Sequence, residues 1–230
     1  MNIYSPLTEA AHAVLDFLFP PECPVCDGAF DSREIICEDC LAELSKCSSL
    51  YLPEKNNPEY VDDVSILLPY DSVCRKMIHA LKYHGMHSTG IVLGKLMARK
   101  TLGNFNFEKS PCLVPVPLHP AKMNERGYNQ SERIAEGFSA FSGFDIRTDL
   151  LTRNKETHTQ TALDHTDRAL NVSGAFSFSG GKSLAGTQIL LVDDVLTTGA
   201  TVSECAKALK DGGAGNITVC VAATPGIGND

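Results

Sequence analysis

The sequence ILLVDDVLTTGAT occupies residues 189–201 and determines how the rest of the chain is interpreted. Its first four residues, Ile189–Val192, form an apolar run of the kind found in parallel strands that are covered on both faces. Two acidic residues and a threonine-rich turn follow, and the turn leads into a helix that we expect over Ala200–Lys210. In open α/β folds such a turn lies at the carboxyl edge of the sheet, where ligands bind.

Short apolar runs alternate with amphipathic stretches on both sides of this motif. Strands that alternate with helices predict an α/β fold with a parallel sheet. The strands we expect besides Ile189–Val192 are Val64–Leu68, Pro111–Pro117, which ends in a proline-stiffened loop, and Ile217–Ala222. The further helices we expect are Asp71–Leu81, Ile91–Arg99 and Ser131–Phe141.

The turn after the acidic pair has the groups that bind a phosphate. A glycine at position 199 lets the backbone approach the phosphate closely. The threonine hydroxyls and the backbone amides at the helix start can donate hydrogen bonds to its oxygens. The predicted phosphate-binding loop consists of Leu196, Thr197, Thr198, Gly199, Ala200 and Thr201.

The carboxylates of Asp193 and Asp194 would repel a phosphate in direct contact with them. They must therefore lie further along the ligand, where they can accept hydrogen bonds from ribose hydroxyls or hold a hydrated Mg²⁺ ion. Phosphate at one end and hydroxyls in the middle fit a sugar phosphate. The alternative is that the acidic pair only caps a helix and that Gly199 makes an ordinary turn.

Five of the nine cysteines fall between positions 23 and 47. Four of them form two C-x-x-C pairs, whose spacing lets four thiolates converge on Zn²⁺: Cys23, Cys26, Cys37 and Cys40. Four cysteine ligands leave no open coordination position, so this zinc would be structural. A redox-active pair is the alternative. The scattered cysteines are expected to be small core side chains: Cys74, Cys112, Cys205 and Cys220.

Composition divides the chain of 230 residues into three parts. Residues 1–50 hold the cysteine cluster and little periodic hydrophobicity, residues 51–58 are rich in Pro and Asn, and residues 59–230 carry the α/β pattern. We therefore predict a zinc-binding module, a linker and one α/β domain, in that order.

The net charge of −8 argues against an extended surface for the nucleic-acid backbone, because such affinity comes from clustered Lys and Arg. The absence of Trp and of interleaved aromatic residues argues against direct single-strand DNA binding by the cysteine module. No run approaches 18 apolar residues, and the apolar stretch at 11–21 has neither a basic leader nor a cleavage site. We expect a cytoplasmic protein without a membrane span.

Taken together, the motifs resemble a known family. The stretch VDDVLTTGAT at 192–201 resembles the signature of type I phosphoribosyltransferases. The stretch VPVPLHP at 114–120, followed by RGYNQSE at 126–132, is similar to the ComF family of competence-related proteins, which includes the GntX-type proteins. Segments 78–85 and 153–176 fit the same family, so the resemblance covers nearly the whole chain.

The resemblance implies a parallel-sheet, type I phosphoribosyltransferase-like domain that binds phosphoribosyl pyrophosphate with Mg²⁺. Pyrophosphate would be displaced at the anomeric carbon by an acceptor that the sequence does not identify. Prolines cannot donate hydrogen bonds, so Leu118 and His119 would supply the backbone amides of the pyrophosphate loop. Arg126 would hold the diphosphate oxygens, unless it is only a solvated charge. Asn129 and Gln130 are expected to cap the following helix.

Three further expectations follow from the family. The stretch Arg153–Arg168 would be a mobile loop that closes over the reacting centre, unless it is simply a polar loop without a role. The family often has another C-x-x-C near Cys47, which this chain lacks, so we expect a single metal site. A non-catalytic ligand sensor that joins a protein partner in DNA uptake is the alternative to a transferase, and homodimer formation is left open.

Overall fold

The computed structural model describes residues 22–28, 36–46, 50–51, 57–70, 72–107, 109–155, 172–181 and 183–225. The chain divides into two compact units, Met1–Lys46 and Cys47–Asp230. The apolar segment 11–21, Cys47 and most of the predicted mobile loop lie outside the described residues. Within the described part of the chain, no helix has the length and the apolar character needed to cross a membrane.

The described residues of the first unit form a tight turn and the helix α2 (Glu38–Lys46). The turn is closed by two backbone hydrogen bonds, from Cys23 N to Gly28 O at 2.9 Å and from Asp27 N to Cys23 O at 2.8 Å. Helix α2 (Glu38–Lys46) begins with two acidic residues, which favour the positive end of the helix dipole. Among the described residues of this unit, the buried apolar side chains besides Cys23 are Val25, Ile36 and Leu44.

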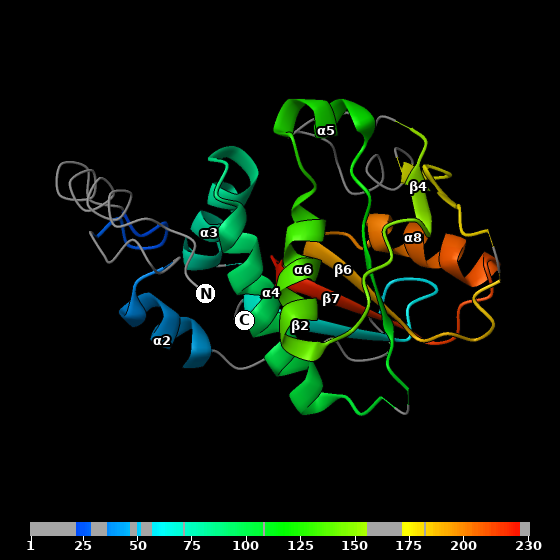
Figure 1. Ribbon diagram of the computed structural model, residues 1–230, viewed down its shortest axis with the longest axis horizontal. Helices are drawn as coiled ribbons and strands as arrows, with labels where there is room; N and C mark the ends of the chain where they lie inside the picture. The colour runs from blue at the N-terminus through cyan, green and yellow to red at the C-terminus, as the bar shows by residue number, and fades with distance from the viewer. Residues whose placement is uncertain are drawn as a thin grey trace, which may run out of the picture. The chain divides into compact units, whose positions relative to one another are not determined.

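The second unit contains a five-stranded sheet with the order β1-β2-β7-β6-β3 (Figure 1). The four strands β2, β7, β6 and β3 are parallel, which confirms the predicted parallel sheet, whereas β1 runs antiparallel at one edge. The bounds are β1 (Leu50–Tyr51), β2 (Asp63–Pro69), β3 (Cys112–Pro115), β6 (Ile189–Val195) and β7 (Ile217–Thr224).

Strand β1 places residues of two predicted segments in the sheet. Leu50 was expected at the end of the zinc module and Tyr51 at the start of the linker, and both pair with β2. The limits of the module and of the linker stay a prediction.

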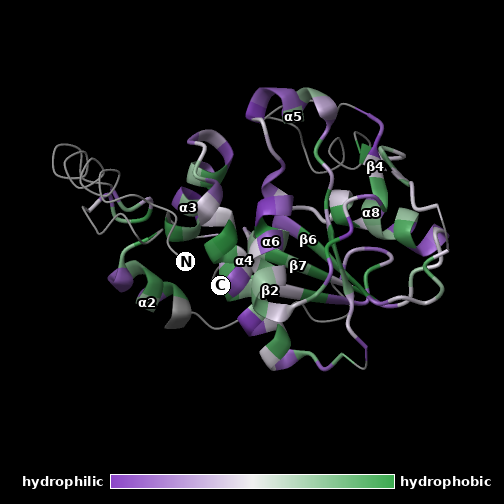
Figure 2. Cartoon of the chain, viewed as in Figure 1, coloured by the Kyte–Doolittle hydropathy of each residue, from purple (hydrophilic) through white to green (hydrophobic). Residues whose placement is uncertain are grey.

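Helices cover both faces of the sheet. Helix α8 (Ala200–Asp211) shares one apolar core with alternate residues of the strands, among them Ile189 and Leu191 of β6. The opposite face contacts α4 (His87–Asn104), where Thr101 Oγ1 lies 2.9 Å from Ser65 Oγ of β2. Figure 2 shows the hydrophobic colouring of the central strands between these layers. The helices α3 (Ser72–Tyr83) and α6 (Gln130–Ser142) agree with the predicted ones.

Besides α2 and β1, three short elements of the second unit were not predicted. A short helix, α5 (Pro120–Arg126), follows the proline-rich loop. An antiparallel pair of three-residue strands, β4 (Leu151–Arg153) and β5 (Phe176–Phe178), forms a second sheet. The core position predicted for the scattered cysteines is confirmed for Cys74, Cys205 and Cys220, each 0% exposed, while Cys112 is half-buried.

Helices α4 and α6 cross with their backbones in contact (Figure 1). A Cβ atom on Gly94 would lie 2.0 Å from the carbonyl oxygen of Ile134, and one on Gly137 would lie 2.1 Å from that of Ile91. Only glycine fits at these two positions. The crossing fixes α6, whose first turn carries the side chains that hold the acidic pair.

Candidate functional site

The acidic pair lies at the carboxyl end of β6, and both carboxylates are buried. Asp194 forms an ion pair with Lys82 Nζ at the end of α3 and accepts a hydrogen bond from Gln130 Nε2 at 3.4 Å. Asp193 Oδ1 accepts hydrogen bonds from Ser131 Oγ and from the Asp194 amide, both at 2.9 Å. Side chains of α3 and α6 therefore hold the pair in place.

The two carboxyl groups differ in their electrostatic surroundings. Burial, together with the adjacent charge of Asp194, raises the pKa of Asp193 to about 7. Burial also acts to raise the pKa of Asp194, but the attraction of Lys82 outweighs it and keeps that pKa below its ordinary value. Burial disfavours the charge of Lys82 as well, yet Asp194 raises the pKa of Lys82 above its usual value. Asp194 and Lys82 are therefore both charged.

The first four residues of the predicted phosphate loop, 196–199, connect β6 to α8, and the last two, Ala200 and Thr201, begin α8. Gly199 is the N-cap of α8 and has a left-handed backbone, with φ at 80°. A Cβ atom there would lie 3.0 Å from Cγ of Pro58. Thr198 Oγ1 accepts a hydrogen bond from Ala200 N at 3.4 Å, and Leu196 O accepts one from the Thr224 hydroxyl at 2.8 Å. Thr197 is exposed and Thr201 is half-buried, beside the helix start.

The residues predicted to bind pyrophosphate lie around α5. Leu118 and His119 are half-buried in the loop between β3 and α5, and His119 is the N-cap of α5, with Nδ1 accepting from Ala121 N at 3.2 Å. Arg126, in the last turn of α5, donates a hydrogen bond to Gln130 Oε1 at 2.5 Å. Gln130 also donates to Asp194, so it links the predicted diphosphate residue to the acidic pair.

Asn129 caps α6 as predicted, because its side chain accepts a hydrogen bond from Ser131 N at 3.0 Å. The expected capping role of Gln130 is wrong, since its amide joins Arg126 and Asp194 instead. Ser131 was not singled out from the sequence. A polar residue in a first helical turn is ordinary, and only the tertiary contact gives these two side chains a place in the site.

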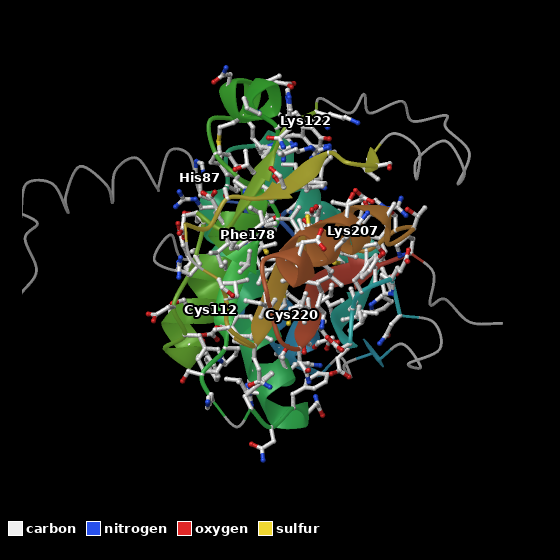
Figure 3. All side chains as sticks on the ribbon, turned by 90° about the vertical axis from the view of Figure 1, so that its right-hand side faces the viewer. His87, Cys112, Lys122, Phe178, Lys207 and Cys220 are labelled. Atoms are coloured by element: carbon white, nitrogen blue, oxygen red, sulfur yellow. The ribbon has the colours of Figure 1, made fainter. Side chains whose placement is uncertain are left out.

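Four cations from the three elements α3, α5 and β4 lie near one another. Burial first, and then the positive charges of Arg153, Arg126 and Lys82, lower the pKa of Lys122. Lys122 belongs to α5, and Arg153 ends β4, with its guanidinium 5.3 Å from the centre of the Phe176 ring. In Figure 3, Lys122 lies at the top of the view and Cys112, which begins β3, lies lower. No motif in the sequence indicated that Lys122 would lie near these cations.

The predicted mobile loop contains five basic residues, of which Arg153 and Lys155 are among the described residues. Lys155 Nζ donates to the carbonyl of Ser173 at 3.0 Å. The other three, His158, His165 and Arg168, lie outside the described residues.

The four predicted zinc ligands converge in the first unit. The Sγ atoms of Cys23, Cys26, Cys37 and Cys40 all lie within 4.8 Å of one another. The two Sγ atoms of Cys26 and Cys37 are 3.7 Å apart, close to the separation of about 3.8 Å that tetrahedral geometry and a Zn–S distance near 2.3 Å require. Sulfur ligands without an open position fit a structural Zn²⁺ ion.

Comparison with known proteins adds two matching family models. A phosphoribosyl transferase domain matches residues 126–229, and a double zinc ribbon domain matches residues 14–55. One solved structure, titled as the allosteric regulatory enzyme of purine biosynthesis, aligns with 59% of this chain and 26% of its own, at 20% identity. Its TM-score of 0.39 is too low to support a structural argument.

Relatives cover most of the chain. Competence protein F of Haemophilus influenzae is 26% identical over 203 residues, which is 86% of this chain and 82% of that protein. Competence protein ComFC of Bacillus subtilis is 28% identical over 83% of this chain and 72% of its own. DNA utilization protein YhgH of Escherichia coli O157:H7 is 30% identical over 62% of this chain and 63% of its own.

The phosphoribosyl transferase model covers the motif at 192–201, and the double zinc ribbon model covers the four clustered cysteines of the two C-x-x-C pairs. The parallel sheet and the cysteine cluster agree with the same assignment. The chain is thus similar over most of its length to competence and DNA utilization proteins, and it combines a cysteine cluster of the zinc ribbon kind with a parallel-sheet, type I phosphoribosyltransferase-like α/β domain.

Proposed function

We propose that this protein binds phosphoribosyl pyrophosphate with Mg²⁺ and transfers the phosphoribosyl group to an acceptor, releasing pyrophosphate. One observation carries the proposal. The glycine- and threonine-rich turn 196–199, a buried acidic pair and a group of cations lie near the carboxyl end of β6. A sugar with a phosphate at one end, hydroxyls in the middle and a diphosphate at the other end has the same order of groups.

Each part of the ligand has a proposed set of partners. The loop 196–201 binds the 5-phosphate through its hydroxyls and amides. Asp193 and Asp194 accept hydrogen bonds from the ribose hydroxyls. Arg126 binds the diphosphate in a bidentate manner, and the amides of Leu118 and His119 contact the same group.

The carboxylates and the diphosphate oxygens are the hard ligands that Mg²⁺ prefers. Because Lys82 already neutralises Asp194, the ion is expected to arrive with the diphosphate rather than to reside in the empty site. Magnesium supplies partial neutralisation of the leaving group when it is bound.

The reaction is a displacement at the anomeric carbon. The acceptor contributes the electron pair of the new bond to C1, and the diphosphate leaves with the pair of the bond that breaks. Positive charge develops on the ribose ring and negative charge on the leaving group, where the nearby cations stabilise it. No side chain has to act as a covalent nucleophile.

The test measures binding first and turnover second. Calorimetry with phosphoribosyl pyrophosphate and Mg²⁺ should detect binding by the full chain, and the double variant Asp193→Asn, Asp194→Asn should lose it. Asp149→Asn is the matched control, because this exposed carboxylate pairs with Arg147 and has no place in the site. Pyrophosphate release is then followed over a panel of amines and bases.

The second candidate is a non-catalytic sensor that keeps the ligand site while the zinc module docks a protein of the DNA-uptake machinery. The names of the relatives, which refer to competence and DNA utilization, favour it. Binding without pyrophosphate release for any acceptor would exclude the transferase and keep the sensor. No binding by the wild-type chain would exclude both.

A further inference from the structure

Lys82 occupies the place where a ribose hydroxyl would bind. Its ammonium group forms an ion pair with Oδ2 of Asp194, and the other carboxylate oxygen accepts from Gln130. The Asp194 side chain is 7% exposed and that of Lys82 is 23% exposed. A sugar hydroxyl that bonds to Asp194 must therefore compete with a largely buried cation.

Displacing Lys82 is costly unless its charge finds a new partner. A buried charge that loses its counter-ion is strongly destabilising. Neighbouring positive charges increase the cost of displacing Lys82, because Arg126 repels its ammonium group and Lys122 lies close enough to interact with it electrostatically. The displaced ammonium therefore needs an anion that the ligand itself brings.

The position of that anion is set by the order of groups in the site. The 5-phosphate is held in the loop 196–201, on the far side of the acidic pair along the ligand. An anionic group on the anomeric carbon instead lies toward Arg126, which Gln130 links to Asp194. Lysine suits such a transfer, because its ammonium group is a compact charge on a flexible stem with three donors.

We propose that Lys82 determines specificity for a diphosphate on the anomeric carbon. It neutralises Asp194 in the empty site and moves to the ligand's diphosphate when the ribose hydroxyls take its place. Ribose 5-phosphate displaces Lys82 without offering it a partner, so the site discriminates against this sugar phosphate. The inference rests on the proposed function, because it requires phosphoribosyl pyrophosphate to bind here.

The test compares two ligands, phosphoribosyl pyrophosphate and ribose 5-phosphate, by calorimetry with Mg²⁺. In Lys82→Met, the affinity for phosphoribosyl pyrophosphate should fall about tenfold or more, which is the range of one charged contact. The affinity for ribose 5-phosphate should rise, because its competitor for Asp194 is gone. Opposite changes for the two ligands are the signature of the exchange.

Two further variants make the result decisive. Lys82→Gln keeps a hydrogen-bond donor for Asp194 without the charge, so it guards against a folding defect and should show the same reversal. Lys122→Met is the matched control, because it removes a cation from the same cluster that is not the ion-pair partner of Asp194. This variant should lower the affinity for both ligands or leave the affinity for ribose 5-phosphate unchanged. It should not raise the affinity for ribose 5-phosphate.

The outcomes separate this inference from the function on which it rests. If wild type binds phosphoribosyl pyrophosphate while the Lys82 variants lose affinity for both ligands by the same factor, Lys82 is a fixed contact. In that case the proposal that it moves from Asp194 to the diphosphate is wrong. The same conclusion follows if neither affinity changes. If wild type binds neither ligand, the proposed function fails and the exchange fails with it.

Discussion

Asp193 and Asp194 are adjacent in the sequence, but the fold gives them opposite properties. Lys82 keeps Asp194 charged, while Asp193 has Ser131 and a backbone amide as partners and remains near its titration point at neutral pH. The sequence predicts the position of both carboxylates from the strand that carries them. It does not predict their partners, since Lys82 and Ser131 are brought to the site by helices far away along the chain.

The raised pKa of Asp193 makes stability depend on pH. Between the unfolded value near 3.8 and the folded value of about 7, the folded state binds more protons than the unfolded one, so stability falls as pH rises. Relative to Asp193→Asn, the wild type should lose on the order of 3 kcal/mol of unfolding free energy between pH 4 and pH 7, and little more above pH 7.

This difference is measured by urea unfolding of both proteins at several pH values without magnesium. Asp149→Asn is the control, because Arg147 lowers the pKa of Asp149 and the sign reverses: wild type should gain stability relative to this variant as pH rises. Parallel pH curves for wild type and Asp193→Asn would contradict the assignment.

Gly199 combines a left-handed backbone with a close neighbour. Gly199→Ala should destabilise the protein by about 1–2 kcal/mol and weaken ribose 5-phosphate binding, because the added methyl group meets Pro58 and shifts the phosphate loop. Gly143→Ala is the matched control, with φ at 75° and no atom within 4 Å of the added Cβ. Gly143→Ala should lose a similar unfolding free energy, measured by urea unfolding. Its affinity for ribose 5-phosphate, measured by calorimetry, should stay unchanged.

Among the secondary-structure elements, the long and strongly periodic ones were predictable. The strands β2, β6 and β7 and the helices α6 and α8 agree with the apolar patterns that predicted them. The ribbon β4–β5 was missed because three-residue strands are too short to show alternation, and α5 because its prolines indicated a loop. The close crossing of α4 and α6 was also not predicted, although the glycines that allow it are visible in the sequence.

Gly94→Ala should force these two helices apart. The added methyl group would overlap the backbone of α6, so we expect a loss of about 2–3 kcal/mol in unfolding free energy or failure to fold. Gly103→Ala in the same helix has open space around it and should be neutral or slightly stabilising. Urea unfolding of both variants checks this, and equal stabilities would show that the helices can separate without cost.

At the scale of the whole molecule, the two units differ in the interactions that stabilise each of them. The second unit has an extensive apolar core around its sheet, whereas the described part of the first has few buried apolar side chains. Below about 70 residues a single apolar core rarely supplies enough stability, and natural folds of that size add a metal or disulfides. The need of the first unit for a metal could be predicted from the sequence, because its two C-x-x-C pairs have the spacing of zinc ligands.

Removing zinc should therefore unfold the first unit and spare the second. Metal analysis should give about one zinc per chain. After chelation, hydrogen exchange should accelerate throughout α2 but stay slow in β6 and β7. Cys37→Ser should behave like the chelated protein, whereas Cys112→Ser should keep its zinc, because Cys112 begins β3 in the other unit. A metal-free protein with a protected α2 would contradict the zinc assignment.

The position of Pro58 beside Gly199 would have a consequence for any molecule that the first unit binds. The chain leaves that unit at Lys46, adds β1 to the sheet and reaches the phosphate loop at Pro58. Even fully extended, the chain between Lys46 and Pro58 spans at most about 40 Å. A molecule bound to the zinc unit would therefore be tethered to the second unit by a short linker, and short linkers produce effective concentrations in the millimolar range. An acceptor or partner with low affinity would then bind as if it were present at high concentration.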